Sequence, residues 1–180
     1  CTDLLNGGRS AGRYRLKLTS INSANGPDDV CAASSIGTIN GLTGTLNLNN
    51  QSNRCATVQS GEPSGGQSTV WYTFTTGATV AKDFNINMDA YSNGLNSDIY
   101  VYRACNTVCP SGSPVWGNLE LVDNFYDVNP LPGEFDAGGT ISGKILPNTT
   151  YYIRADGTST VGEEGEFNIN MSRSEERRVG

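Results

Sequence analysis

Short stretches of alternating apolar and polar residues fill the chain from Gly41 onward, and Gly, Pro, Asn and Asp separate them. Because successive side chains of a strand point to opposite faces of a sheet, this alternation predicts strands with one buried face. The predicted strands are residues 41–49, 68–75, 82–88, 97–103, 119–125, 140–146, 149–155 and 165–172. We expect residues 140–146 and 149–155 to pair across Pro147–Asn148, and a turn near residues 29–34. The pattern predicts an all-β fold, an antiparallel β-sandwich of jelly-roll type with eight or nine strands.

The apolar positions of these strands share one parity in each strand and form the predicted core. These positions are Val70, Tyr72, Phe74, Phe84, Ile86, Ile99, Val101, Ile153, Phe167 and Ile169.

An internal repeat indicates how the chain is organised. The segment GRYRLKLT from Gly12 and the segment GEFNINMS from Gly165 share one pattern of glycine, aromatic and aliphatic positions. This predicts that residues 1–21 end a preceding repeat, that residues 22–29 (NSANGPDD) are a linker, and that residues 30–172 form the sandwich domain. The last eight residues, RSEERRVG, back-translate into the start of a common sequencing adapter, so we interpret residues 173–180 as an artefact.

Composition and charge exclude several classes of function. A hydrophobic fraction of 36% with 22 Gly fits many short strands joined by polar turns. A net charge of −6 without a basic patch argues against nucleic acid and anionic membrane surfaces as partners. No apolar run reaches the length of a membrane span, so no membrane insertion is expected. The chain has no His, which excludes Ser-His-Asp and Cys-His nucleophiles and His-containing zinc sites, and we predict no enzyme activity.

The five cysteines favour disulfides over the alternative, free buried thiols in a cytosolic protein. None of them forms a C-x-x-C pair, and disulfides predict an oxidising compartment, so the protein is expected to be secreted or at the cell surface. From proximity in sequence we predict the pairs Cys31–Cys55 and Cys105–Cys109. Cys1 is then left over, with a partner expected upstream.

Acidic residues raise the question of a metal site. Asp98, Asp123 and Asp127 would supply three carboxylates to Ca²⁺ if the loops at one end of the sandwich bring them together. No D-x-D-x-D-G loop is present, and the alternative is a solvated acidic loop. Calcium is the one cofactor that the sequence suggests.

Aromatic side chains on a sandwich face are candidates for stacking on sugars. The candidates are Tyr100, Tyr102, Trp116 and Phe125, whereas Trp71 is expected in the core. Trp116 lies in a Gly- and Pro-rich loop, and the alternative for it is that it caps the core.

Five short segments occur in a characteristic order: PDDVCAA, STVWYTF, SDIYVY, TTYYIRADG and GEFNINM. Together they resemble the bacterial pre-peptidase C-terminal domain and its relatives with a CUB-like jelly-roll fold. The resemblance implies a non-catalytic accessory or adhesive module of a large exported bacterial protein, with flanking domains of the same polypeptide as partners. It also implies contacts to polysaccharide, calcium or another surface protein. The alternative is a carbohydrate-binding module that tethers an attached hydrolase to its substrate.

Overall fold

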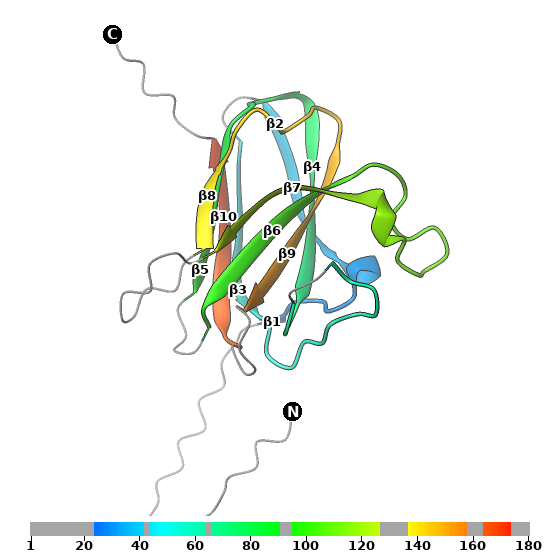
Figure 1. Cartoon of the computed structure of the whole chain (residues 1–180). Coiled ribbons are helices and arrows are strands. Elements are labelled where there is room, and N and C mark those ends of the chain that lie inside the picture. The colour runs from blue at the N-terminus through cyan, green and yellow to red at the C-terminus, as the bar shows by residue number, and fades with distance from the viewer. Residues whose placement is uncertain are drawn as a thin grey trace, which may run out of the picture.

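Two five-stranded sheets pack face to face in the computed structural model, which describes residues 24–41, 44–63, 66–90, 95–126, 137–157 and 164–173 (Figure 1). Sheet A has the order β1 (Ala24–Asn25), β3 (Thr45–Ser52), β10 (Glu166–Arg173), β5 (Phe84–Ala90) and β8 (Ala137–Ile141). Sheet B has the order β2 (Ser34–Gly41), β4 (Val70–Val80), β9 (Thr150–Gly157), β6 (Ser97–Ala104) and β7 (Leu119–Tyr126). Two short 3₁₀ helices, η1 (Val30–Ala32) and η2 (Trp116–Asn118), lie in the connections. Within these described ranges, no helix is long and apolar enough to cross a membrane.

The strand order is that of a jelly roll, which confirms the predicted fold class. From β3 to β10, each connection passes to the other sheet, except the one that joins β6 and β7 in sheet B. The sandwich core of the fold therefore consists of β3–β10–β5–β8 against β4–β9–β6–β7. The described residues form nine strands of five or more residues, plus the two-residue β1, close to the predicted eight or nine.

The core between the sheets consists of the residues predicted for it. All ten of them are at most 1% exposed. The period-two pattern is visible in β5, where Phe84, Ile86 and Met88 are buried and the residues between them are exposed. The rings of Phe74 in β4 and Tyr151 in β9 stack with centroids 5.0 Å apart, and this contact stabilises the pairing of two central strands of sheet B.

One prediction about the strands was wrong, and one strand was missed. The pairing of residues 140–146 with 149–155 does not form, because β8 pairs with β5 in sheet A while β9 lies between β4 and β6 in sheet B. Both strands turn their apolar side chains toward the core, but from opposite sheets. A sequence pattern cannot distinguish this arrangement from a hairpin. Strand β2 was not predicted, because bulges in its parallel pairing with β4, at Gly37 with a φ of +135°, break the period of two.

The segment predicted as a linker contributes to the domain. Residues 24–25 form β1, which pairs with β3, and the carbonyl of Pro27 accepts a hydrogen bond from the backbone N–H of Trp71 at 2.8 Å. The predictions for residues 1–21 and 174–180 lie outside the described residues, and Arg173 is the last residue of β10.

The central strands of sheet B are buried on both faces. On the side turned away from sheet A, Trp71 of β4 and Tyr102 of β6 pack with Val30 and Val108 in a second, smaller apolar cluster. This outer face is covered by η1, by the connection between β3 and β4, and by the connection between β6 and β7. Three of the described connections therefore lie on the outer face of sheet B, where the candidate site lies.

Candidate functional site

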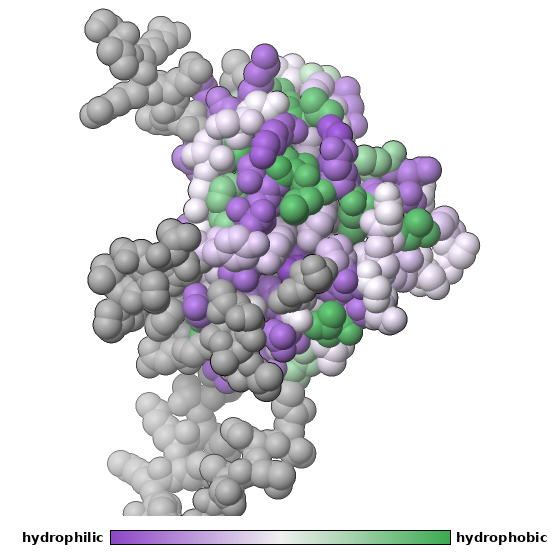
Figure 2. All heavy atoms as spheres, in the orientation of Figure 1, coloured by the Kyte–Doolittle hydropathy of each residue, from purple (hydrophilic) through white to green (hydrophobic). Residues whose placement is uncertain are grey.

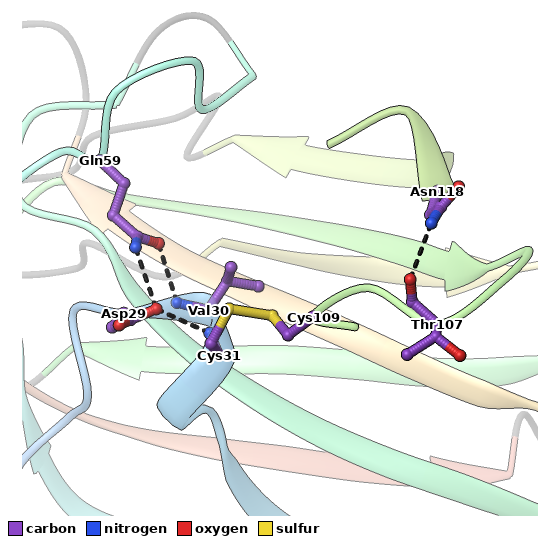
Figure 3. The surroundings of a disulfide bond; sticks show 7 residues. All are labelled: Asp29, Val30, Cys31, Gln59, Thr107, Cys109 and Asn118. Carbon is purple, nitrogen blue, oxygen red and sulfur yellow. Dashed lines mark hydrogen bonds between the residues drawn. A yellow bond between two sulfur atoms is a disulfide. The ribbon is translucent and has the colours of Figure 1, made fainter. Parts of the chain in front are cut away.

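A disulfide joins two of the segments that cover the outer face of sheet B (Figure 3). Cys31 in η1 is bonded to Cys109, 78 residues later, with Cα atoms 5.6 Å apart. The side chain of Asp29 caps η1 by accepting a hydrogen bond from the Cys31 N–H at 2.8 Å. Gln59 links the β3–β4 connection to the same point: it accepts from the Val30 N–H at 2.8 Å and donates to Asp29 at 2.9 Å.

The predicted disulfide pairs were therefore wrong. Cys31 is bonded to Cys109, so neither Cys31–Cys55 nor Cys105–Cys109 forms, and Cys55 is disulfide-bonded to another residue. Cys105 is a free, exposed thiol 3.2 Å from a carboxylate oxygen of Glu120. The presence of disulfides is confirmed, but their pairing depends on the folding of η1 and the β6–β7 connection over the same face. Proximity in sequence does not report that arrangement.

A buried arginine lies in the middle of this face. Arg154 of β9 is 0% exposed, and its guanidinium carbon lies 3.9 Å from the ring centroid of Tyr100, directly opposite on β6. Its Nη1 donates to the carbonyl oxygen of Pro63 at 2.6 Å, and its Nη2 forms an ion pair with Asp156 at 3.7 Å. A buried charge of this kind is tolerated only when it is paired and hydrogen-bonded.

Two carboxylates hold the β3–β4 connection next to the arginine. Asp156 accepts hydrogen bonds from the backbone N–H groups of Gln67 and Ser68, both at 3.1 Å. Glu62 accepts from the N–H of Gln59 at 2.9 Å and from the hydroxyl of Thr69 at 3.1 Å. Burial raises the pKa of both carboxyls above their usual values, and these hydrogen bonds and Arg154 only partly oppose it.

Beside the arginine, an open groove of about 410 Å³ lies along β6 and β7. We call it the tyrosine groove. Its lining consists of Pro63, Tyr100, Tyr102, Leu119, Leu121, Asn124 and Tyr126. Tyr100 and Tyr102 are two residues apart and therefore lie on the same face of β6, with nearly parallel rings 6.4 Å apart. Tyr126 and Leu121 of β7 are 45% and 49% exposed, unusually open for large apolar side chains.

The groove is uncharged and carries its polar atoms on tyrosine and asparagine. The Tyr100 hydroxyl donates to the Tyr126 hydroxyl at 3.4 Å, and the two rings meet edge to face. Burial raises the pKa of Tyr100 and of Tyr102, so both hydroxyls stay protonated at neutral pH. Figure 2, in the orientation of Figure 1, shows hydrophobic atoms gathered in the middle of this face among hydrophilic ones.

Of the four predicted ligand-binding aromatics, two line the groove and two pack elsewhere. Tyr100 and Tyr102 lie together in the groove, whereas Phe125 faces the core, because it is directly opposite the buried Ile99 of β6. Trp116 packs on Trp71 with ring centroids 5.8 Å apart and donates to the Ser60 carbonyl at 3.1 Å, so it covers the apolar cluster. Its neighbour Gly61 has a φ of +79° and lies against the indole ring, where a side chain would be strained.

The sequence reasoning missed Tyr126, Leu121, Asn124 and Arg154. Tyr126 follows the predicted strand 119–125 directly, and the parity of that strand separates it from Phe125. A bulge in the pairing of β6 with β7, next to Val101, shifts the parity along β7 and hides this signal in the sequence.

The predicted calcium ligands are not brought together as far as they are described. Asp123 is directly opposite Val101, which lies three positions after Asp98 along β6, so the two carboxylates point to opposite faces of sheet B. Asp123 forms an ion pair with Lys144 at 2.9 Å. Asp127 lies outside the described residues, and among those described no three potential metal-ligating side chains cluster.

Comparisons with known proteins give no relatives by sequence: no family model matches the chain, and no curated protein matches it. Among solved structures, one is CorA, a surface-associated copper-binding protein important in Methylomicrobium album BG8 copper acquisition. It has a TM-score of 0.45 and 9% identity, and the match covers 77% of this chain and 100% of CorA. Another is PliG of Aeromonas hydrophila, a periplasmic inhibitor of g-type lysozyme, with a TM-score of 0.36, 15% identity, and coverage of 79% and 100%.

A β-glucosidase of Paenibacillus barengoltzii matches with a TM-score of 0.35 and 8% identity, over 87% of this chain and 14% of that enzyme. With TM-scores below 0.5 and identities of at most 15%, none of the three assigns a function to this chain.

Proposed function

We propose that this chain is a non-catalytic accessory module of an exported protein, and that it acts by binding carbohydrate in the tyrosine groove. The observation that carries the proposal is the groove itself, an open and uncharged surface along β6 and β7 on which Tyr126 and Leu121 are well exposed. The Cys31–Cys109 disulfide supports an oxidising, extracytoplasmic location. The lack of histidine and the uncharged lining of the groove support a binding role rather than a catalytic one.

The chemistry of the lining fits a sugar ring. Each face of a hexopyranose exposes C–H groups that pack on the flat face of an aromatic ring, while its hydroxyls need hydrogen-bond partners at the rim. Tyr126, which is 45% exposed, and the partly exposed Tyr100 offer the rings, and the Asn124 amide and the Tyr126 hydroxyl offer the polar partners. Tyr102 is buried and packs against Tyr100. An open groove rather than a closed pocket suits a segment of a polymer.

The charge of the site selects among carbohydrates. No charged side chain lines the groove, and the neighbouring Arg154 is buried and paired with Asp156. The net charge of the chain is −6, so an anionic polysaccharide would be repelled. The expected ligand is therefore an uncharged glycan.

Affinity electrophoresis tests this proposal with named polysaccharides. The probes are the uncharged hydroxyethyl cellulose, galactomannan, xyloglucan and dextran, and the anionic alginate and polygalacturonate. We expect retardation by at least one uncharged polymer and by neither anionic one. Tyr126→Ala should weaken that binding by about tenfold or more, since truncation of a central aromatic contact commonly costs 1–2 kcal/mol or more.

The matched control is Val115→Ala, which truncates an exposed apolar residue (41% exposed) outside the groove and should leave binding unchanged. Absence of retardation by every uncharged polymer would refute carbohydrate binding. Equal weakening by the two variants would refute the groove as the site.

Adhesion to another surface protein is the second candidate function, favoured by the exposure of Leu121 and Tyr126 at the edge strand β7. Membership of the pre-peptidase C-terminal-like repeats stays a proposal that fits either role. In the carbohydrate case, the module would hold an attached hydrolase near its substrate.

A further inference from the structure

The tyrosine groove has two walls that come from distant parts of the chain. One wall is formed by side chains of β6 and β7, with Tyr100 and Tyr102 on β6, and the other is Pro63, in the connection between β3 and β4. No strand pairing fixes Pro63 relative to β6, because this connection lies over the outer face rather than in the sheet. The contacts that hold Pro63 in place therefore set the width of the groove.

Arg154 contacts both walls, at Tyr100 and at Pro63. Its guanidinium carbon lies over the Tyr100 ring, 3.9 Å from the ring centroid, while its Nη1 donates to the Pro63 carbonyl at 2.6 Å. The planar guanidinium is suited to do both at once, because its face stacks on an aromatic ring while its edge donates hydrogen bonds in a fixed direction. The side chain is completely buried, so it does not reach a ligand in the groove.

Burial of the Arg154 guanidinium costs desolvation free energy, so its presence at this position calls for a structural reason. An apolar side chain of similar volume commonly replaces a buried ion pair without loss of stability. Charge compensation of Asp156 alone does not require an arginine either, because a lysine would also provide a positive charge. What lysine lacks is the combination of a stacking face and a directed edge.

We propose that Arg154 is the positioning residue of the tyrosine groove, which fixes the Pro63 wall at the correct distance from Tyr100. This inference rests on the proposed function of the groove, and it concerns how the site is built rather than what it binds. Without the arginine, the β3–β4 connection keeps its contacts at Gln59, Gln67 and Ser68 but loses the bond nearest to the groove.

The test is Arg154→Lys, which keeps the positive charge beside Asp156 but not the stacked, bifunctional group. Two readouts are measured. The first is amide hydrogen exchange of the peptide that contains residues 59–63, in protein without any polysaccharide. The second is affinity for the uncharged polysaccharide that retards the parent protein. We expect exchange in this peptide to accelerate about tenfold and the affinity to fall by a similar factor, while exchange in β4 and β10 stays unchanged.

Pro63→Ala is the matched control, because it removes the wall but keeps the carbonyl that Arg154 holds. It should reduce affinity without accelerating exchange at residues 59–62. If Arg154→Lys does not fold, Tyr100→Leu replaces it: this variant keeps the arginine and its ion pair and removes only the ring, and it should accelerate the same exchange.

Parent-like exchange at residues 59–63 in Arg154→Lys, or in Tyr100→Leu where that variant is used, would overturn the positioning role. A parent protein that binds none of the uncharged polysaccharides would refute the proposed function instead. The exchange measurement would still decide whether the arginine holds the wall, because it needs no ligand.

Discussion

Removal of the Cys31–Cys109 disulfide should destabilise the domain strongly. The bond closes a loop with a sequence separation of 78 residues. In the chain-entropy model, a loop of this length restricts the unfolded chain by roughly 4–5 kcal/mol, and native disulfides of secreted domains typically contribute about 2–5 kcal/mol. For a domain of this size, a loss of about 4–5 kcal/mol lowers the melting temperature by roughly 8–20 °C. The disulfide also joins η1 to the β6–β7 connection, so its loss frees two of the segments that cover Trp71.

The assay is urea unfolding of the double variant Cys31→Ser/Cys109→Ser, with tryptophan fluorescence as the signal. Both tryptophans of the chain, Trp71 and Trp116, lie in the layer that the disulfide joins, so the signal reports on the affected region. Cys105→Ser is the matched control, because this exposed thiol is free, and its unfolding midpoint should be unchanged. A loss below about 1 kcal/mol in the double variant would refute the reasoning. So would a mass spectrum of the native protein in which the Cys109 peptide is linked to Cys105.

Two further predictions concern the core and the buried carboxylates. Phe74→Ala should lower the free energy of unfolding by about 3–5 kcal/mol in urea titrations, because Phe74 is 1% exposed and stacks on Tyr151; a loss under about 1 kcal/mol would contradict its place in the core. Burial raises the pKa of Glu62 and Asp156, so the folded state binds protons more tightly than the unfolded chain. Their contribution to stability is complete below the unfolded pKa values and is lost as the pH rises through the folded ones. Unfolding of parent and Glu62→Gln between pH 7 and 5 should therefore show a larger gain in stability on acidification for the parent, and identical pH profiles would count against the burial effect.

The alternation of apolar residues was sufficient to predict the architecture. Apolar residues at every second position predict the buried face of a strand, because the apolar side chains must face the core. This pattern correctly identified Val70, Tyr72 and Phe74 in one strand, and Phe167 and Ile169 in another. The presence of disulfides was predictable from five cysteines in a polar, Gly-rich β-protein. The pair Tyr100–Tyr102 was identified as a binding candidate, because two tyrosines two residues apart on a strand lie on the same face.

Only the tertiary structure determined which distant segments meet on the outer face of sheet B. The crossing connections of the jelly roll, or a bulge in strand pairing, bring together three pairs of residues: Cys31 with Cys109, Arg154 with Pro63, and Tyr100 with Tyr126. Local periodicity determines which face of a strand is buried, but it carries no information about which loop covers that face. The core of this protein was therefore readable in its sequence, whereas the disulfide pairing and the walls of the groove depend on contacts between segments far apart in the chain.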